Sequence, residues 1–177
     1  FSGPKEEFLA SLGMRFTISP AGEDDLQRAE ELTVRTNQLN TTGRTYSYDE
    51  LRSYAESEAH LLLVAELEDK HGTYGKIGLA LVETGAEVWT LKLLLMSCRV
   101  MARGVGTVML NHVMHRARAA GARLVAELVP NDRNRMMLIT LRLGGFRECG
   151  RDGETLLLES TGAEVPPPPD YLELVIH

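Results

Sequence analysis

The residues with the most distinctive chemistry lie in one short turn, between an apolar run and a segment of helical spacing. The stretch LKLLLMSCRVMARGVGTVML contains Arg103, Gly104 and Gly106 at that point. Glycine allows a tight turn and a close approach of the backbone to a bound group, and the unpaired N–H groups of a helix start point the same way. Backed by the helix dipole, such donors suit the oxygens of a phosphate or pyrophosphate. The turn therefore predicts an anion site at Arg103, Gly104, Val105, Gly106 and Thr107, although a plain strand-to-helix turn would show the same glycines.

Polar side chains near this turn each allow two interpretations. Arg99 and Arg103 can meet phosphates or an acidic partner, or they can be solvated surface charges. Cys98 can act as an acyl-accepting nucleophile in catalysis, or it can be a small packed residue, which is the commoner fate of a free cysteine. His112 lies on the apolar face of the following helix, so a packed, hydrogen-bonded imidazole is favoured over a general base.

Three asparagines are further candidates. Asn37 and Asn40 lie in the polar loop NQLNTTGR, where they can cap helix ends and turns or take a catalytic role in contact with the substrate. Asn134 lies near the expected start of a later helix. This position favours a helix cap first and a contact to a bound cofactor second.

Composition limits the classes of function. The 177 residues carry a net charge of −6, so a general nucleic-acid binder, which needs a broad basic surface, is not expected. The only cysteines, Cys98 and Cys149, suggest neither a disulfide framework nor a metal site. No stretch is long enough to span a bilayer and no signal peptide is evident, so a cytoplasmic location without membrane contact is expected. The chain starts with FSGP instead of methionine, which we interpret as a cut within a longer protein.

Hydrophobic spacing predicts the elements that must position these side chains. Apolar alternation or continuous apolar runs predict strands at 14–19, 61–67, 76–83, 88–97, 124–129, 146–149 and 155–159. Helical periodicity predicts helices at 5–12, 23–38, 48–57, 105–120 and 131–143. Ser47 and Glu50 form a capping box for the third of these helices. The prolines at 166–169 begin an extended tail.

The order of these elements and the place of the glycine turn resemble the GNAT acyltransferase superfamily. The resemblance implies an α/β (α+β) fold, with a central mixed, mainly antiparallel sheet of about seven strands flanked by about four helices. It also implies that the turn holds the pyrophosphate of an acyl coenzyme A and that the backbone of Leu95, Met96 and Ser97 contacts the pantetheine arm. The superfamily pattern is Arg or Gln, two residues, then Gly-x-Gly; Met101 stands at its first position here, so only the backbone part is kept. Leu141 stands where many members carry a tyrosine that protonates the leaving thiolate, and leucine cannot be a general acid.

Four longer stretches resemble the C-terminal region of the FkbH-like proteins of polyketide biosynthesis: RTNQLNTTGRTYS, VAELEDKHGTYGKIGLALVE, WTLKLLLMSCRVMARGVGTVML and VPNDRNRMM. In such proteins a phosphatase-like domain of the HAD superfamily comes first, and a glyceryl group is loaded onto the phosphopantetheine of an acyl carrier protein, towards methoxymalonyl extender units. The resemblance implies three partners, which are an acyl carrier protein, the N-terminal HAD-like domain and a small acyl substrate. It implies a linker or helix at 1–12, an acyltransferase domain at 13–160 and a proline-rich tail at 161–177.

Two classes of function follow. The first is an acyltransferase that uses coenzyme A or carrier-bound phosphopantetheine and no metal, and in which the backbone at 95–97 polarises a thioester carbonyl. The second is a non-catalytic module that holds the phosphopantetheine arm while chemistry occurs elsewhere. An acyl-CoA-dependent N-acetyltransferase is a further alternative. Leu141 favours the second class or a hybrid, although a thiolate whose pKa lies near the working pH can leave without a general acid.

Overall fold

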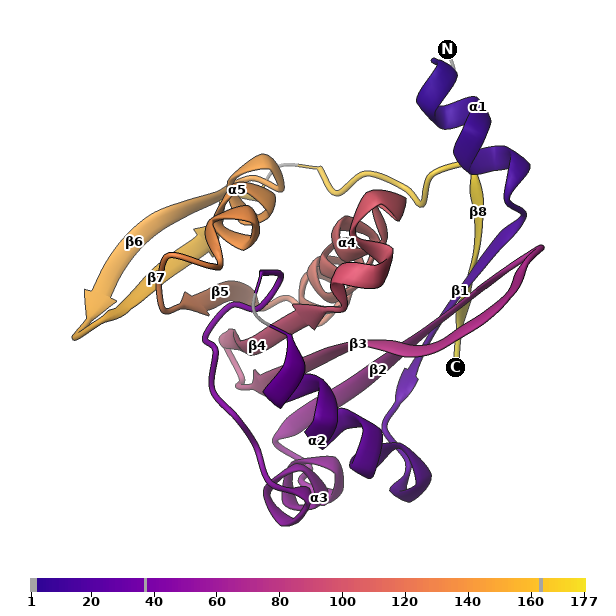
Figure 1. Ribbon diagram of the computed structural model, residues 1–177. Helices are drawn as coiled ribbons and strands as arrows, with labels where there is room; N and C mark the ends of the chain where they lie inside the picture. Colours follow the sequence, from indigo (N-terminus) through magenta and orange to yellow (C-terminus); the bar gives the residue numbers. More distant parts are fainter. Residues whose placement is uncertain (1–2, 37, 163) are drawn as a thin grey trace.

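One mixed sheet runs through the computed structural model, which describes residues 3–36, 38–162 and 164–177. Its strands are β1 (Met14–Pro20), β2 (His60–Asp69), β3 (Gly72–Thr84), β4 (Val88–Met96), β5 (Arg123–Leu128), β6 (Phe146–Asp152), β7 (Thr155–Ser160) and β8 (Leu172–Ile176). They lie in the order β6-β7-β5-β4-β3-β2-β1-β8 (Figure 1). Neighbouring strands run antiparallel except for two parallel pairs, β4 with β5 and β1 with β8.

Helices cover both faces of this sheet (Figure 1). They are α1 (Pro4–Ser11), α2 (Leu26–Arg35), α3 (Tyr48–Glu56), α4 (Val105–Ala119) and α5 (Arg135–Leu143). On one face, α2 and α3 pack over a core that contains Leu93 and Leu95 of β4. On the other face, α1, α4 and α5 pack over a core that contains Leu94 and Met96. Because side chains alternate along a strand, β4 is buried on both sides, as its continuous apolar run requires.

The architecture confirms the expected α/β (α+β) class with a mixed, mainly antiparallel sheet. The antiparallel succession of β2, β3 and β4 and the hairpin of β6 and β7 lie where the apolar runs predicted them. The capping box of α3 is also confirmed, since Glu50 N–H donates to Ser47 Oγ at 3.1 Å and Ser47 N–H to the Glu50 carboxylate at 3.0 Å. The described residues form eight strands instead of about seven, because the tail contributes β8.

The helix expected from residue 131 begins four residues later, at Arg135. The Asn131 side chain accepts hydrogen bonds from the backbone N–H groups of Arg133, at 2.7 Å, and Asn134, at 2.9 Å. A local turn of this kind satisfies backbone donors outside a helix and therefore competes with helix formation.

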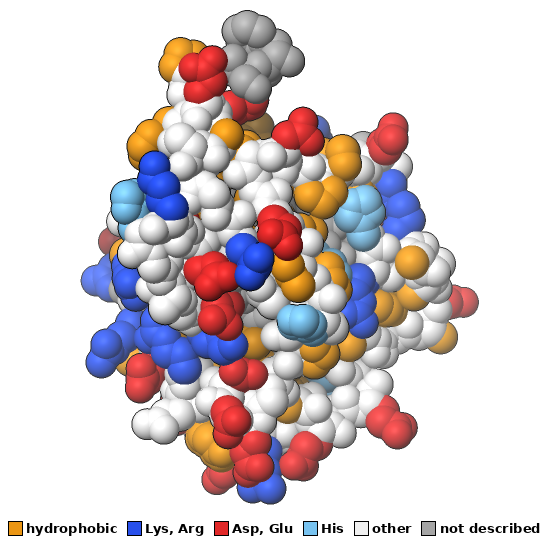
Figure 2. All heavy atoms as spheres, turned by 90° about the vertical axis from the view of Figure 1, so that its right-hand side faces the viewer, with side chains coloured by type: hydrophobic (Ala, Val, Ile, Leu, Met, Phe, Trp, Pro, Cys, Tyr) orange, Lys and Arg blue, Asp and Glu red, His pale blue; other side chains and the backbone are white. Residues whose placement is uncertain are grey.

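The two ends of the chain pack onto the same sheet. Leu9 and Leu12 are buried in the same core as the apolar residues of α4, and β8 pairs with β1 at the sheet edge. Near that edge, Arg15 Nη1 lies 3.2 Å from Glu68 Oε1 of β2, and Arg15 Nε lies 3.4 Å from Glu173 Oε2 of β8. Figure 2, which views the molecule from this side, shows side chains of both charges over the surface. Charges along an edge strand disfavour pairing with a further chain.

The domain boundaries expected at residues 12 and 160 stay predictions. Across the described segments, every helix is too short or too polar to cross a membrane.

Midway along its length, β4 parts from β5. The parallel pairing of these strands covers only residues 88–91 of β4. Lys92 then forms a β-bulge, because Leu91 and Leu93 pair with consecutive residues of β3. Beyond the bulge, β4 still pairs with β3, but its other edge faces a gap that β5 no longer fills.

The burial of His112, on α4, leads us to expect that the protein loses stability as the pH falls. Burial first, and then the charges of Arg116 and His115, lower the pKa of His112 to about 4, and its Nε2 has no hydrogen-bond partner among the described residues. The expected hydrogen bond is therefore missing at this atom. Because the unfolded chain binds a proton near pH 6.5 and the folded chain only near pH 4, stability is complete above about pH 6.5 and falls as the pH drops towards 4.

In the wild type, the free energy of unfolding should fall between pH 7 and pH 4.5. The replacement His112→Leu should make this fall smaller by roughly 1–2 kcal/mol, after allowance for solvent screening of a half-buried ring. Urea unfolding at pH 7 and at pH 4.5 measures the difference. His177→Gln, at an exposed position outside α4, is the control and should keep the wild-type difference. An unchanged difference in His112→Leu would contradict the prediction.

Candidate functional site

The glycine turn joins β4 to α4 as the sequence predicted. A 3₁₀ helix, η2 (Cys98–Arg103), follows β4, and Gly104 then reverses the chain with a φ of 74°. Val105 is fully buried and anchors the start of α4 in the core, whereas Thr107 is exposed. A Cβ added to Gly106 would meet nothing within 4 Å, so the first turn of α4 opens onto free space. The five residues of the predicted anion site therefore lie together around one helix N-terminus.

Tyr74 of β3 holds both arginines beside the turn. Its hydroxyl accepts a hydrogen bond from Arg103 Nη2 at 3.3 Å and donates to the Asp69 carboxylate at 3.0 Å. The Arg99 guanidinium lies 5.8 Å from the centre of the Tyr74 ring, within the range of a cation–π contact. Arg103 Nε is buried without a partner in the described part of the chain. Two positive charges thus lie next to the turn, and the Asp69 carboxylate on the same tyrosine interacts electrostatically with Arg103.

Tyr171, in the C-terminal tail, covers the other side of the turn. Its hydroxyl lies 2.8 Å from the position that a Cβ on Gly104 would occupy. Burial first, and then Glu6, raise the pKa of this phenol, so it stays neutral at physiological pH. Gly104 is therefore required both by its positive φ and by the close approach of Tyr171.

A narrow pocket of about 80 Å³ lies directly beside the turn. It is lined by Leu39, Leu94, Met96, Gly104, Gly106, Thr107, Met136, Met137 and Thr140. None of these described lining residues has an ionisable side chain. The three residues from α5 were missed by the sequence reasoning, although their spacing along one helical stretch could have indicated a shared wall.

The gap between β4 and β5 is filled by residues 39–41, which we call the inserted segment. Leu94 N–H donates to Thr41 Oγ1 at 3.0 Å, and Leu94 C=O accepts from Thr41 N–H at 3.0 Å. Met96 N–H donates to Leu39 C=O at 2.9 Å. On the opposite side, Thr41 C=O accepts from Val129 N–H at 2.8 Å, just beyond β5. The inserted segment therefore bridges β4 and the end of β5 like a short additional strand.

Two buried asparagines hold the inserted segment in place. The Asn134 amide donates to the carbonyl oxygens of Asn40 at 3.1 Å, Thr41 at 3.4 Å and Val129 at 2.9 Å. The Asn40 amide donates to Thr36 C=O, and its Oδ1 accepts from the next two backbone N–H groups after Thr41. These contacts are structural. The catalytic role predicted for Asn40 and the cofactor contact predicted for Asn134 stay predictions, and Asn37 lies outside the described residues.

The three residues predicted to contact the pantetheine arm, Leu95, Met96 and Ser97, differ in the polar groups of their side chains. Leu95 and Met96 are fully buried, and the Ser97 hydroxyl accepts a bond from Arg99 N–H at 3.3 Å. Cys98 is exposed, so its interpretation as a packed core thiol is wrong. It lines a second, polar pocket of about 460 Å³ with Arg35, Thr36, Gln38, Asp132 and Arg133. The nucleophilic role of Cys98 stays a prediction.

Leu141 provides no chemistry at the position of the superfamily tyrosine. It is fully buried and packs in the core under α4 and α5. Within the described ranges, no three His, Cys, Asp or Glu side chains are grouped so that they could hold a metal ion. Near the turn, the positively charged side chains of Arg99 and Arg103 contact Tyr74.

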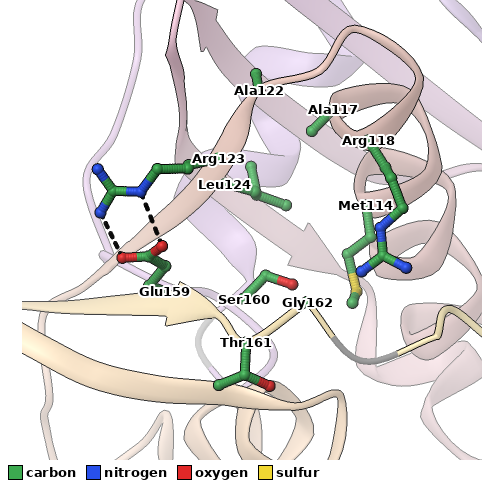
Figure 3. Close-up of a pocket in the computed structure, with 10 residues that line it drawn as sticks. All are labelled: Met114, Ala117, Arg118, Ala122, Arg123, Leu124, Glu159, Ser160, Thr161 and Gly162. Carbon is green, nitrogen blue, oxygen red and sulfur yellow. Dashed lines mark hydrogen bonds and ion pairs between the residues drawn. The ribbon is translucent and has the colours of Figure 1, made fainter.

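A further pocket, of about 290 Å³, lies between the C-terminal half of α4 and the end of β7 (Figure 3). Figure 3 shows Arg123 and Glu159 facing each other at one side of it, with nitrogen–oxygen distances of 2.9 and 2.6 Å. This pair of hydrogen bonds raises the pKa of Arg123 and lowers the pKa of Glu159. Because the two charges neutralise each other, this pair gives the pocket no preference for an anion.

The order of the elements and the glycine turn between β4 and α4 are those expected of the GNAT fold, and solved structures of GNAT domains share the fold of this chain. Neither the sequence profiles of known protein families nor the sequences of curated proteins match this chain. The fold is established instead by comparison with solved structures.

The chain is similar to the ribosomal-protein-S18-alanine N-acetyltransferase of Escherichia coli, with a TM-score of 0.62 and 16% identity over 84% of this chain and 96% of that one. It is similar to the yncA protein of Salmonella typhimurium, solved with its cofactor acetyl-CoA, with a TM-score of 0.59 and 17% identity over 88% of this chain and 99% of that one. It is also similar to the aminoglycoside acetyltransferase AAC(6')-Ib in complex with coenzyme A, with a TM-score of 0.60 and 14% identity over 82% and 95% of the two chains. At these identities the likeness establishes the fold alone.

The two glycines of the turn should respond oppositely to alanine. Gly106→Ala should raise the free energy of unfolding by about 0.5–1 kcal/mol, because alanine is the better helix former and the added Cβ meets open space. Gly104→Ala should lower it by roughly 1–3 kcal/mol, because of the positive φ and the contact with Tyr171. Urea unfolding of both variants is the measurement, and shifts of the same sign would count against this geometry.

Proposed function

We propose that this chain is an acyltransferase domain that binds a thioester donor, either an acyl coenzyme A or an acyl phosphopantetheine, at the glycine turn. The observation that most supports the proposal is the open space at Gly106, in the first turn of α4, where a helix leaves its N–H groups without intrahelical partners. Arg99 and Arg103 add positive charge beside that space. Two of the similar proteins were solved with acetyl-CoA or coenzyme A, which supports the same class of donor.

We propose that the acceptor is the phosphopantetheine thiol of an acyl carrier protein and that the acyl group is glyceryl, supplied by an HAD-like domain. The four stretches that resemble FkbH-like proteins support this assignment. In the reaction, the carrier thiolate attacks the acyl carbon, the carbon–sulfur bond to the donor breaks, and the donor sulfur leaves as a thiolate that takes up the proton lost by the acceptor. Orientation of the two thiol-bearing arms would supply much of the rate.

The chemistry of the pocket beside the turn supports a thiol acceptor over an amine acceptor. An aliphatic amine is protonated near neutral pH and needs a base before it can attack, whereas a thiol with a pKa near 8.5 already supplies a few per cent of thiolate. The described lining of this pocket contains no acid or base, and Leu141 replaces the superfamily tyrosine. The same observation supports the second candidate, a module that only holds the phosphopantetheine arm.

Binding of the donor should fail when Gly106 is enlarged. Gly106→Leu places a side chain in the space proposed for phosphate oxygens, so the affinity for coenzyme A should fall at least about tenfold while the fold is retained. Ala119→Leu, on the exposed end of the same helix, is the matched control and should bind like the wild type. Isothermal calorimetry measures both, and equal affinities in the two variants would argue against the turn as donor site.

The reaction should distinguish thiols from amines. With acetyl-CoA and a panel of amines, the isolated chain should give weak or no acetylation, because general-acid help worth about a hundredfold or more is missing. With the HAD-like domain, a glyceryl donor and a carrier protein, mass spectrometry should show a loaded carrier. Robust amine acetylation by this chain, or full loading of the carrier without it, would refute the glyceryl assignment.

A further inference from the structure

The edge of β4 that faces the gap already has a binding partner within the chain. The N–H and C=O groups of Leu94 and the N–H group of Met96 are all bonded to the inserted segment, residues 39–41. We propose that the inserted segment occupies the place of the donor's pantetheine arm, so that the donor binds only after this segment withdraws from β4. This inference rests on the proposed function and concerns the regulation of the same site.

The chemistry of the two occupants is alike. A pantetheine arm is an extended chain with two amide groups, and an extended amide chain binds a free strand edge through the same backbone N–H and C=O groups. At Leu94 and Met96 those groups are bonded to Leu39 and Thr41. Both occupants therefore compete for one set of backbone groups.

The space left beside the turn leads to the same conclusion. The pocket between β4, α4 and α5 measures about 80 Å³, and Leu39 forms one of its walls. Pockets that hold cofactors or drug-sized ligands usually measure about 300–1,000 Å³. The site is thus open at Gly106 and filled along β4 by the inserted segment, so that the pantetheine arm can bind along β4 only after this segment withdraws.

The contacts of the inserted segment allow it to leave. It is held by hydrogen bonds from Leu94, Met96, Val129 and Asn134, each of modest net strength because water or a ligand can replace it. Its one large apolar anchor is Leu39, which is buried beside β4. An arriving pantetheine arm would replace the bonds to β4 with equivalent bonds. The bonds from Val129 and Asn134 and the burial of Leu39 are then the cost of withdrawal, which binding of the donor must offset.

Thr41→Val tests the competition directly. Valine keeps the size of threonine but removes the oxygen that accepts from Leu94 N–H, so the segment should be held less tightly and the affinity for coenzyme A should rise about three- to tenfold. Thr42→Val is the matched control. Its hydroxyl accepts from Arg44 N–H, within the same loop, so the affinity of this variant should equal that of the wild type. A weaker or unchanged affinity in Thr41→Val would overturn the inference.

Hydrogen exchange with and without coenzyme A separates this inference from the proposed function. If the segment withdraws, coenzyme A should lower the protection of the Thr41 and Val129 amides, while the Leu94 and Met96 amides stay protected by the ligand. If coenzyme A binds and the Thr41 and Val129 amides stay protected, the inference is wrong and the donor site stands. If neither the wild type nor Thr41→Val binds coenzyme A or a carrier-bound phosphopantetheine, the proposed function fails and the inference fails with it.

Discussion

The backbone of β4 beyond its bulge is the constraint on which the rest of the candidate site depends. Leu94 and Met96 are buried, and their N–H groups face a gap that β5 has left. A buried N–H group without a partner costs about as much free energy as the hydrogen bond that it lacks, so the gap must be filled. In this chain the inserted segment fills it, which explains why a polar loop is buried at the centre of the fold.

The buried polar side chains follow from the same constraint. Asn40, Thr41 and Asn134 are each almost fully buried, and each side chain has hydrogen-bond partners for its polar atoms. Residues 39–41 do not continue a regular strand, so side-chain amides and a hydroxyl supply the bonds that a sheet ladder would otherwise supply. Asparagines that resemble a catalytic cluster in sequence therefore form, in the structure, a network that joins β4, the end of β5 and the start of α5.

Elements that follow from a local pattern of residues could be predicted from the sequence, whereas elements that depend on contacts between distant residues could not. The strands at 61–67 and 88–97 follow from apolar runs, and the turn follows from Gly104 and Gly106. The pairing of Thr41 with Leu94 joins residues 53 positions apart, and the polar composition of the loop is typical of an exposed segment. The strand β8 was missed for the same reason, because five residues after a proline run become a strand only by pairing with β1.

The contact between Tyr171 and Gly104 gives the end of the chain a part in the geometry of the turn. The hydroxyl of Tyr171 fixes how closely anything can approach Gly104 from the tail side, and β8 holds that tyrosine through its pairing with β1. A substitution in the tail can therefore alter the shape of the turn while every residue of the turn stays the same. Variation among related chains at this site is accordingly to be sought at their C-terminal ends as well as in the glycine motif.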